Sequence, residues 1–119
     1  MEETKKLLQD IIEGIQEKKG KQIVVADLTD IEDTICQYFV ICQGNSPMQV
    51  SAIAESIREF TLKSSHVKPS AVDGMRNATW VAMDYANVMV HVFLPETRMF
   101  YDLEHLWADA KLTDIPDLD

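Results

Sequence analysis

The chain has 119 residues, of which 46% are hydrophobic and 26% charged, and its formal net charge is −9. This composition is typical of one soluble globular domain, and no apolar run approaches the ~20 residues that a membrane-spanning helix needs. The acidic excess would repel a phosphate backbone, so stand-alone nucleic-acid binding is disfavoured.

The first part of the chain predicts one helix followed by two strands. Apolar residues at helical spacing mark a helix over residues 4–18, and Gly20 is expected to adopt the left-handed conformation that ends it. Strand-like runs occupy 22–28 and 37–43, on either side of an acidic connection. The second run is apolar throughout its centre, which predicts a strand that is covered on both faces, in the middle of a sheet with helices packed on it.

A second helix is expected directly after the second strand. In the stretch GNSPMQ (44–49), Ser46 can cap a helix, Pro47 suits its first position and Gln49 completes a capping box. Apolar residues at helical spacing continue this helix to about Lys63.

Strands return in the second half of the chain. A short strand over 68–72 leads into a turn at Asp73–Gly74. Strands over 79–84 and 88–94 then flank Tyr85, Ala86 and Asn87 (85–87), which predict a hairpin turn.

The C-terminal part predicts a short helical segment over 96–110, with Asp102 as an N-terminal cap, and an acidic tail that frays. The order of elements predicts a mixed α/β fold, α+β-like, with helices packed on a mixed sheet. We expect a single domain over residues 1–110 and an acidic C-terminal tail over 111–119.

The residue types that bind metals do not occur at metal-site spacing. His66, His91 and His105 form no HxH or HxxxH pair, and no cysteine falls beside them at a suitable distance. Cys36 and Cys42 are six residues apart. If they share an extended segment, their Cα atoms are about 20 Å from each other, which is beyond disulfide reach. We therefore expect free thiols, no metal and no cofactor. Since the N-terminal residues also lack the pattern of a signal or transit peptide, we expect a cytoplasmic protein.

The sequence contains neither a nucleophile elbow nor a phosphate-binding loop. Gly44 and Ser46 are faintly similar to the glycine-serine turn of nucleotidyltransferases. That chemistry also needs paired carboxylates to hold metal ions, and the later strands supply only Asp84. We predict that the protein is not an enzyme.

Aromatic and charged side chains gather in the last forty residues, where a partner-binding surface is predicted. Tryptophan, tyrosine and arginine are the types most enriched at interface hot spots. From residue 84 to 119, eight acidic residues face only two basic ones, a net charge of −6 that would attract a basic partner. The predicted partner-binding residues are Trp80, Asp84, Tyr85, Arg98, Tyr101, Asp102, Glu104 and Trp107.

Two simpler interpretations stay open. The acidic residues can serve solubility alone. The aromatic residues can form a small core between the hairpin and the C-terminal helix, and for Phe93 and Phe100 we favour this interpretation.

Four blocks together resemble a known family. They are QYFVICQGNSPMQVSAIAESI (37–57), DG (73–74), WVAMDYANVMVHVF (80–93) and RMFYDLEHLWADA (98–110). In this order and spacing they resemble the ribosomal silencing factor, or Iojap-related, family, over about residues 4–110.

The resemblance implies a nucleotidyltransferase-like fold without its catalytic residues. It also implies binding to the large ribosomal subunit through large-subunit ribosomal protein fourteen, so that the small subunit cannot join and translation is repressed when nutrients are short. The alternatives are a small nucleotidyltransferase-type enzyme and a homodimeric scaffold.

The sequence departs from the family pattern at three places. Gln37 stands where the family has Asp, Ala86–Asn87 where it has Gly-Asp, and Asp73–Gly74 where it has Glu-Gly. If position 86 needs a positive φ, alanine there costs about 1 kcal/mol, unless Asn87 takes the left-handed conformation instead.

Overall fold

The computed structural model describes residues 2–31, 36–103 and 110–117. Three helices and six strands occur in this part of the chain. In chain order they are α1 (Glu2–Glu17), β1 (Lys21–Asp27), β2 (Tyr38–Gln43), α2 (Pro47–Ser65), β3 (Ala71–Asp73), β4 (Trp80–Asp84), β5 (Val88–Phe93), α3 (Pro95–Tyr101) and β6 (Lys111–Ile115).

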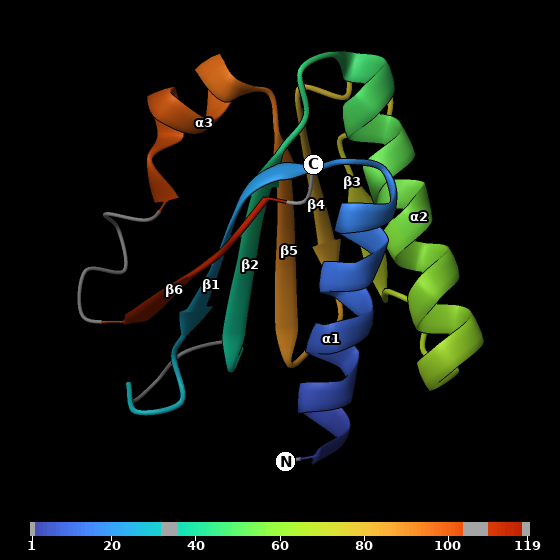
Figure 1. Ribbon diagram of the computed structural model, residues 1–119, viewed down its shortest axis with the longest axis vertical. Helices are drawn as coiled ribbons and strands as arrows, with labels where there is room; N and C mark the ends of the chain where they lie inside the picture. The colour runs from blue at the N-terminus through green and yellow to red at the C-terminus, as the bar shows by residue number, and fades with distance from the viewer. Residues whose placement is uncertain (1, 32–35, 104–109, 118–119) are drawn as a thin grey trace.

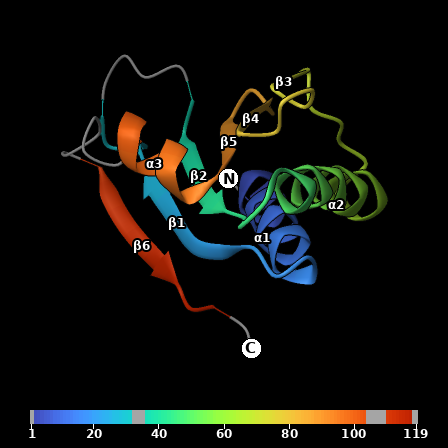
Figure 2. The same ribbon diagram turned by 90° about the horizontal axis from the view of Figure 1, so that it is seen from above.

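The strands form one mixed sheet in the order β3-β4-β5-β2-β1-β6. The central pair, β2 and β5, is parallel, and the other four pairs are antiparallel. Helices α1 and α2 lie side by side on one face of the sheet (Figure 1). Seen from above, α3 lies on the opposite face (Figure 2). The predicted mixed α/β class is confirmed, with helices on both sides of the sheet.

The central strands are buried on both faces, as the apolar run of β2 predicts. Along β5, Val88, Val90 and Val92 point into the core under α1 and α2. His91 and Phe93 alternate with these valines and are buried on the other side of the sheet, which therefore has a second packed layer.

Helices α1 and α2 approach each other closely at Gly14. A Cβ atom there would lie 2.8 Å from the Cα of Ile57, and the hydroxyl of Ser56 donates a hydrogen bond of 2.8 Å to the Gly14 carbonyl. This position therefore has no room for a side chain, and the contact sets the distance between the two helices.

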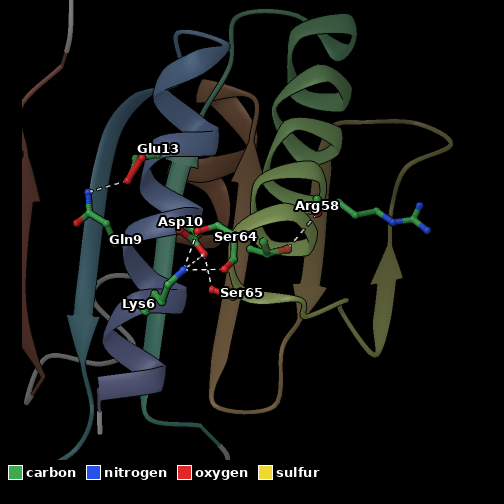
Figure 3. Close-up of polar contacts among 8 residues, drawn as sticks. Lys6, Gln9, Asp10, Glu13, Arg58, Ser64 and Ser65 are labelled. Carbon is green, nitrogen blue, oxygen red and sulfur yellow. Dashed lines mark hydrogen bonds and ion pairs between the residues drawn. The ribbon is translucent and has the colours of Figure 1, made fainter.

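A polar contact joins the start of α1 to the end of α2 (Figure 3). The Nζ of Lys6 donates to the carbonyl and hydroxyl oxygens of Ser64, at 2.8 and 2.7 Å, and lies 3.7 Å from the carboxylate of Asp10. Asp10 is buried and also accepts a hydrogen bond from the hydroxyl of Ser65. The two helices are thus joined by polar groups at one end and by close backbone packing at Gly14.

The capping prediction for α2 is confirmed with a small difference. The Ser46 hydroxyl accepts from the backbone N–H of Gln49 at 3.1 Å, and Pro47 takes the first helical position. The Gln49 side chain reaches one residue further than a capping box requires, because its Oε1 accepts from the N–H of Asn45 at 2.7 Å.

The end of α1 was predicted incorrectly in one respect. Lys19, with φ 60°, takes the left-handed conformation that was expected for Gly20. Gly20 serves close packing instead, since a Cβ there would lie 2.4 Å from Cγ2 of Ile15. The glycine at position 20 is therefore required because a side chain would clash with Ile15, and not because the backbone is left-handed there.

The predicted hairpin between β4 and β5 is confirmed, with Asp84 opposite Met89. Ala86 takes a φ of 70°, so the left-handed position falls on the alanine and Asn87 does not relieve it. The Asp84 carboxylate accepts a hydrogen bond of 2.7 Å from the Ala86 N–H, which supports this turn.

The expected fraying of the acidic tail is wrong for residues 111–115. They form β6, which pairs antiparallel with β1 along its length, with Leu112 opposite Ala26 and Ile115 opposite Ile23. Residues 111–115 (KLTDI) show no regular alternation of apolar and polar residues, so this strand is set by its distant pairing with β1 and not by a local pattern.

We expect Gly14→Ala to lower the free energy of unfolding by about 1–3 kcal/mol, because the added methyl group must push α1 and α2 apart. The helix preference of alanine offsets only part of this cost. Glu17→Ala, at an exposed position of the same helix, is the matched control and should change stability little. Urea unfolding measures both, and a stable Gly14→Ala protein would contradict the close-packing argument.

Ala86→Gly should raise the free energy of unfolding by about 1 kcal/mol, because glycine adopts a positive φ without the steric cost of a Cβ. Asn87→Gly should give no such gain, since Asn87 is not in the left-handed region. Thermal unfolding distinguishes the two variants, and a gain in Asn87→Gly alone would mean that the left-handed residue has been misplaced.

Candidate partner-binding site

The side of β4 and β5 that faces away from α1 and α2 carries a continuous cluster of rings. Trp80, at the start of β4, stacks on Phe93 of β5 with ring centres 5.1 Å apart. On its outer side it meets Tyr101 of α3 at 4.6 Å. His91 lies 5.8 Å from Trp80 and meets the ring of Phe39 edge-on at 5.4 Å. The cluster therefore runs from the buried centre of the sheet to the surface of α3.

A hydrogen bond fixes the inner part of this cluster. The indole Nε1–H of Trp80 donates to Nδ1 of His91 at 3.0 Å. Because an indole N–H can only donate, this Nδ1 carries no proton and the neutral imidazole holds its proton on Nε2. Burial lowers the pKa of His91 from its ordinary 6.5 to about 4, so the acceptor is retained at neutral pH.

The outer part of the cluster is exposed. Met99 and Phe100 are 81% and 80% exposed, and Tyr101 is half-exposed beside them. Phe100 and Tyr101 meet edge-to-face at 5.1 Å. We call Trp80, Met99, Phe100 and Tyr101 together the aromatic surface.

The aromatic surface borders a shallow groove of about 370 Å³. Thr79, Glu96 and Thr97 line the rest of this groove, so a carboxylate and two hydroxyl groups lie beside the rings. Such a mixture of rigid aromatic rings and a few polar groups is typical of protein-recognition sites.

Arg98 has a structural role here, although it was predicted to contact a partner. It is buried, and its guanidinium donates to the carbonyl of Gln22 at 2.6 Å and to the side chain of Gln43 at 3.3 Å. These bonds attach α3 to the ends of β1 and β2. Asp102 ends α3 in a left-handed conformation, with its N–H bonded to the Arg98 carbonyl. Its expected role as the N-terminal cap of the following helical segment concerns residues 104–109, which lie outside the described residues.

Tyr85 is a core residue, which corrects its expected place on the surface. Only 6% of it is exposed, and its hydroxyl shares a 2.8 Å hydrogen bond with Oγ1 of Thr61. Burial raises the pKa of this phenol. Asp84 is half-buried and supports the hairpin turn, whereas Trp80 and Tyr101 lie together at the surface.

Phe100 was expected to lie in the core and is among the most exposed apolar side chains of the described residues, whereas Phe93 is buried as predicted. His91 belongs to the ring cluster and Met99 to the aromatic surface, and neither is among the partner-binding residues predicted from the sequence. The alternation of β5 placed His91 beside Phe93, and this spacing was the signal that could have found it. Glu104 and Trp107 lie outside the described residues.

The cysteines are buried free thiols, as expected. Burial raises the pKa of Cys42 to about 12 and also raises that of Cys36, so neither is activated as a nucleophile. Within the described ranges, no group of three or more His, Cys, Asp or Glu side chains could hold a metal ion. None of the helices in the same ranges is long and apolar enough to cross a membrane.

Comparison with known proteins decides the family. The family model described as "Ribosomal silencing factor during starvation" matches residues 1–119. The chain belongs to the ribosomal silencing factor family. Ribosomal silencing factors of Halalkalibacterium halodurans and Bacillus subtilis are each 35% identical to it, over 92% and 93% of this chain and 92% of each relative. The chloroplastic protein Iojap of Zea mays is 32% identical over 67% of this chain and 34% of its own length.

Two solved structures share the fold of this chain. A crystal structure of a Chromobacterium violaceum protein superposes with a TM-score of 0.81 at 34% identity, covering 87% of this chain and 85% of that one. One from Bacillus halodurans gives 0.76 at 31% identity and covers 97% and 98% of the two chains.

Acidification should destabilise this ribosomal silencing factor through His91. Between pH 6.5 and pH 4 the unfolded chain binds a proton at this residue that the folded chain does not, because burial lowers the folded pKa to about 4. The stabilisation is complete above pH 6.5 and decreases as pH falls, by about 3 kcal/mol in total. Urea unfolding at several pH values measures this effect. The free energy of unfolding of His91→Asn should depend less steeply on pH than that of the unsubstituted protein, and equal pH dependences would contradict the prediction.

Proposed function

We propose that this ribosomal silencing factor is a cytoplasmic translational repressor that binds the large ribosomal subunit through large-subunit ribosomal protein fourteen. Binding there blocks the small subunit from joining, and the protein acts without catalysis. The observation that carries the proposal is the aromatic surface, which presents three rings and a methionine beside a groove in a chain of this family.

Charge supports the same partner. Ribosomal proteins are generally basic where they anchor in RNA, and a chain with a net charge of −9 is complementary to such a protein. The same negative charge resists non-specific attachment to ribosomal RNA. Asp84, Asp102 and Glu104 remain proposed contributors to this attraction, and Trp107 a proposed contact.

The aromatic surface is also held in place by the fold, which favours tight binding by a blocking factor. Trp80 is packed between Phe93 and Tyr101, and Arg98 attaches α3 to the sheet, so the surface is preorganised before a partner arrives. Binding then orders few side chains, and more of the interaction energy is kept as affinity. A steric block requires only that the complex last longer than an attempt at subunit joining.

Trp80→Ala and Phe100→Ala should each weaken binding to the large subunit at least about tenfold, because large rings at an interface centre are typical hot spots. Met48→Ala is the matched control, since Met48 is 83% exposed at the start of α2 and lies outside the aromatic surface. Sucrose-gradient co-sedimentation and a subunit-joining assay measure the effect.

Circular dichroism must show that each variant is folded, which is expected for Phe100→Ala because its side chain is exposed. If both aromatic variants are folded and still block joining at wild-type concentrations, the proposed site is wrong. Nucleotide transfer in the presence of magnesium would favour the enzymatic alternative, and a homodimer mass in size-exclusion measurements would favour the scaffold.

A further inference from the structure

Trp80 and His91 occupy diagonal positions on neighbouring antiparallel strands. Trp80 lies opposite Phe93, and His91 lies opposite Ala82, two residues further along β4. Diagonal neighbours on one face of a sheet are within reach of each other only when the side chains are long or aromatic. The small Ala82 leaves space for the indole and imidazole rings to meet over it.

The hydrogen bond between these rings selects one orientation of the indole. A tryptophan stacked on Phe93 can be flipped about its χ2 angle without losing the stacking, but the flipped ring would point its only N–H away from Nδ1 of His91. His91 therefore distinguishes two orientations that apolar packing alone leaves similar in energy.

His91 is itself held in place. Only 7% of it is exposed, the Phe39 ring meets it edge-on at an interplanar angle of 88°, and Phe93 stacks beside it at 6.0 Å. An acceptor fixed on two sides can impose its direction on a neighbour, whereas a mobile acceptor would follow it.

We infer that His91 is a positioning residue for partner binding: it fixes the indole of Trp80 in the orientation that packs against Tyr101 and completes the aromatic surface. This inference rests on the proposed function, because it assigns a buried residue to the same site. His91 touches no partner, and its effect on affinity passes through the 3.0 Å hydrogen bond to Trp80.

The test compares three variants of the full chain. His91→Leu removes the acceptor and keeps much of the volume. His91→Asn places an amide oxygen at the position of Nδ1, because both atoms are bonded to Cγ, and it can restore the acceptor. Val92→Ala is the matched control, since Val92 is fully buried on the opposite face of β5 and its loss destabilises the core without touching Trp80.

Two measurements are made at a temperature where all variants are folded. The first is the indole N–H resonance of Trp80 and its hydrogen exchange in the free protein; the chain has two tryptophans, and Trp107→Phe assigns the peaks. The second is affinity for purified large ribosomal subunits by pelleting. His91→Leu should shift the resonance, speed its exchange and weaken binding about fivefold to tenfold, as for the loss of one buried hydrogen bond.

His91→Asn should recover most of both properties, and Val92→Ala should keep both despite a lower Tm. An unchanged indole resonance in His91→Leu, or equal weakening by Val92→Ala, overturns the positioning role. If Trp80→Ala weakens binding and His91→Leu binds like the wild type, the positioning role of His91 is wrong and the proposed binding site stands. Wild-type binding by Trp80→Ala overturns the proposed site and the positioning role with it.

Discussion

The burial of β5 on both faces is the constraint on which the rest of this structure depends. Its valines pack under α1 and α2, while His91 and Phe93 pack into the aromatic cluster on the other side. One strand thus belongs to two cores, and its parallel pairing with β2 fixes both layers in the same register. A change in the register of β5 would exchange the two sets of side chains and disrupt the helix layer and the aromatic surface together.

The aromatic surface is therefore an outward extension of the core. Ring contacts continue from Phe39 through His91 and Trp80 to Tyr101 without a break in packing. Ordering mobile side chains reduces the affinity of a surface, and here the contacts that hold the rings of Trp80 and Tyr101 also stabilise the fold. Residues that stabilise the fold and residues that bind a partner overlap in this protein, so stability and affinity have to be measured on the same variants.

Local patterns in the sequence predicted most elements, because their causes are local. The apolar centre of β2, the Ser46 cap and the alternation along β5 each express a short-range rule that the fold obeys. The errors arise where distant contacts decide. Tyr85 is buried because Thr61 offers its hydroxyl a partner, and Phe100 is exposed because Arg98 fixes the orientation of α3 through β1 and β2. Both contacts join residues far apart in the sequence, so the local sequence around Tyr85 and Phe100 contains no pattern that predicts them.

The pairing of β1 with β6 has a consequence for how the molecule assembles. Ile23 and Ile115 lie near opposite ends of the described chain, so closing this pair costs more chain entropy than the hairpin between β4 and β5. The hairpin between β4 and β5 can therefore form early, and the pairing of β6 with β1 is completed late. Because most of β6 is exposed, it can also detach first, leaving a strand edge open to pairing with another chain while the central strands remain folded.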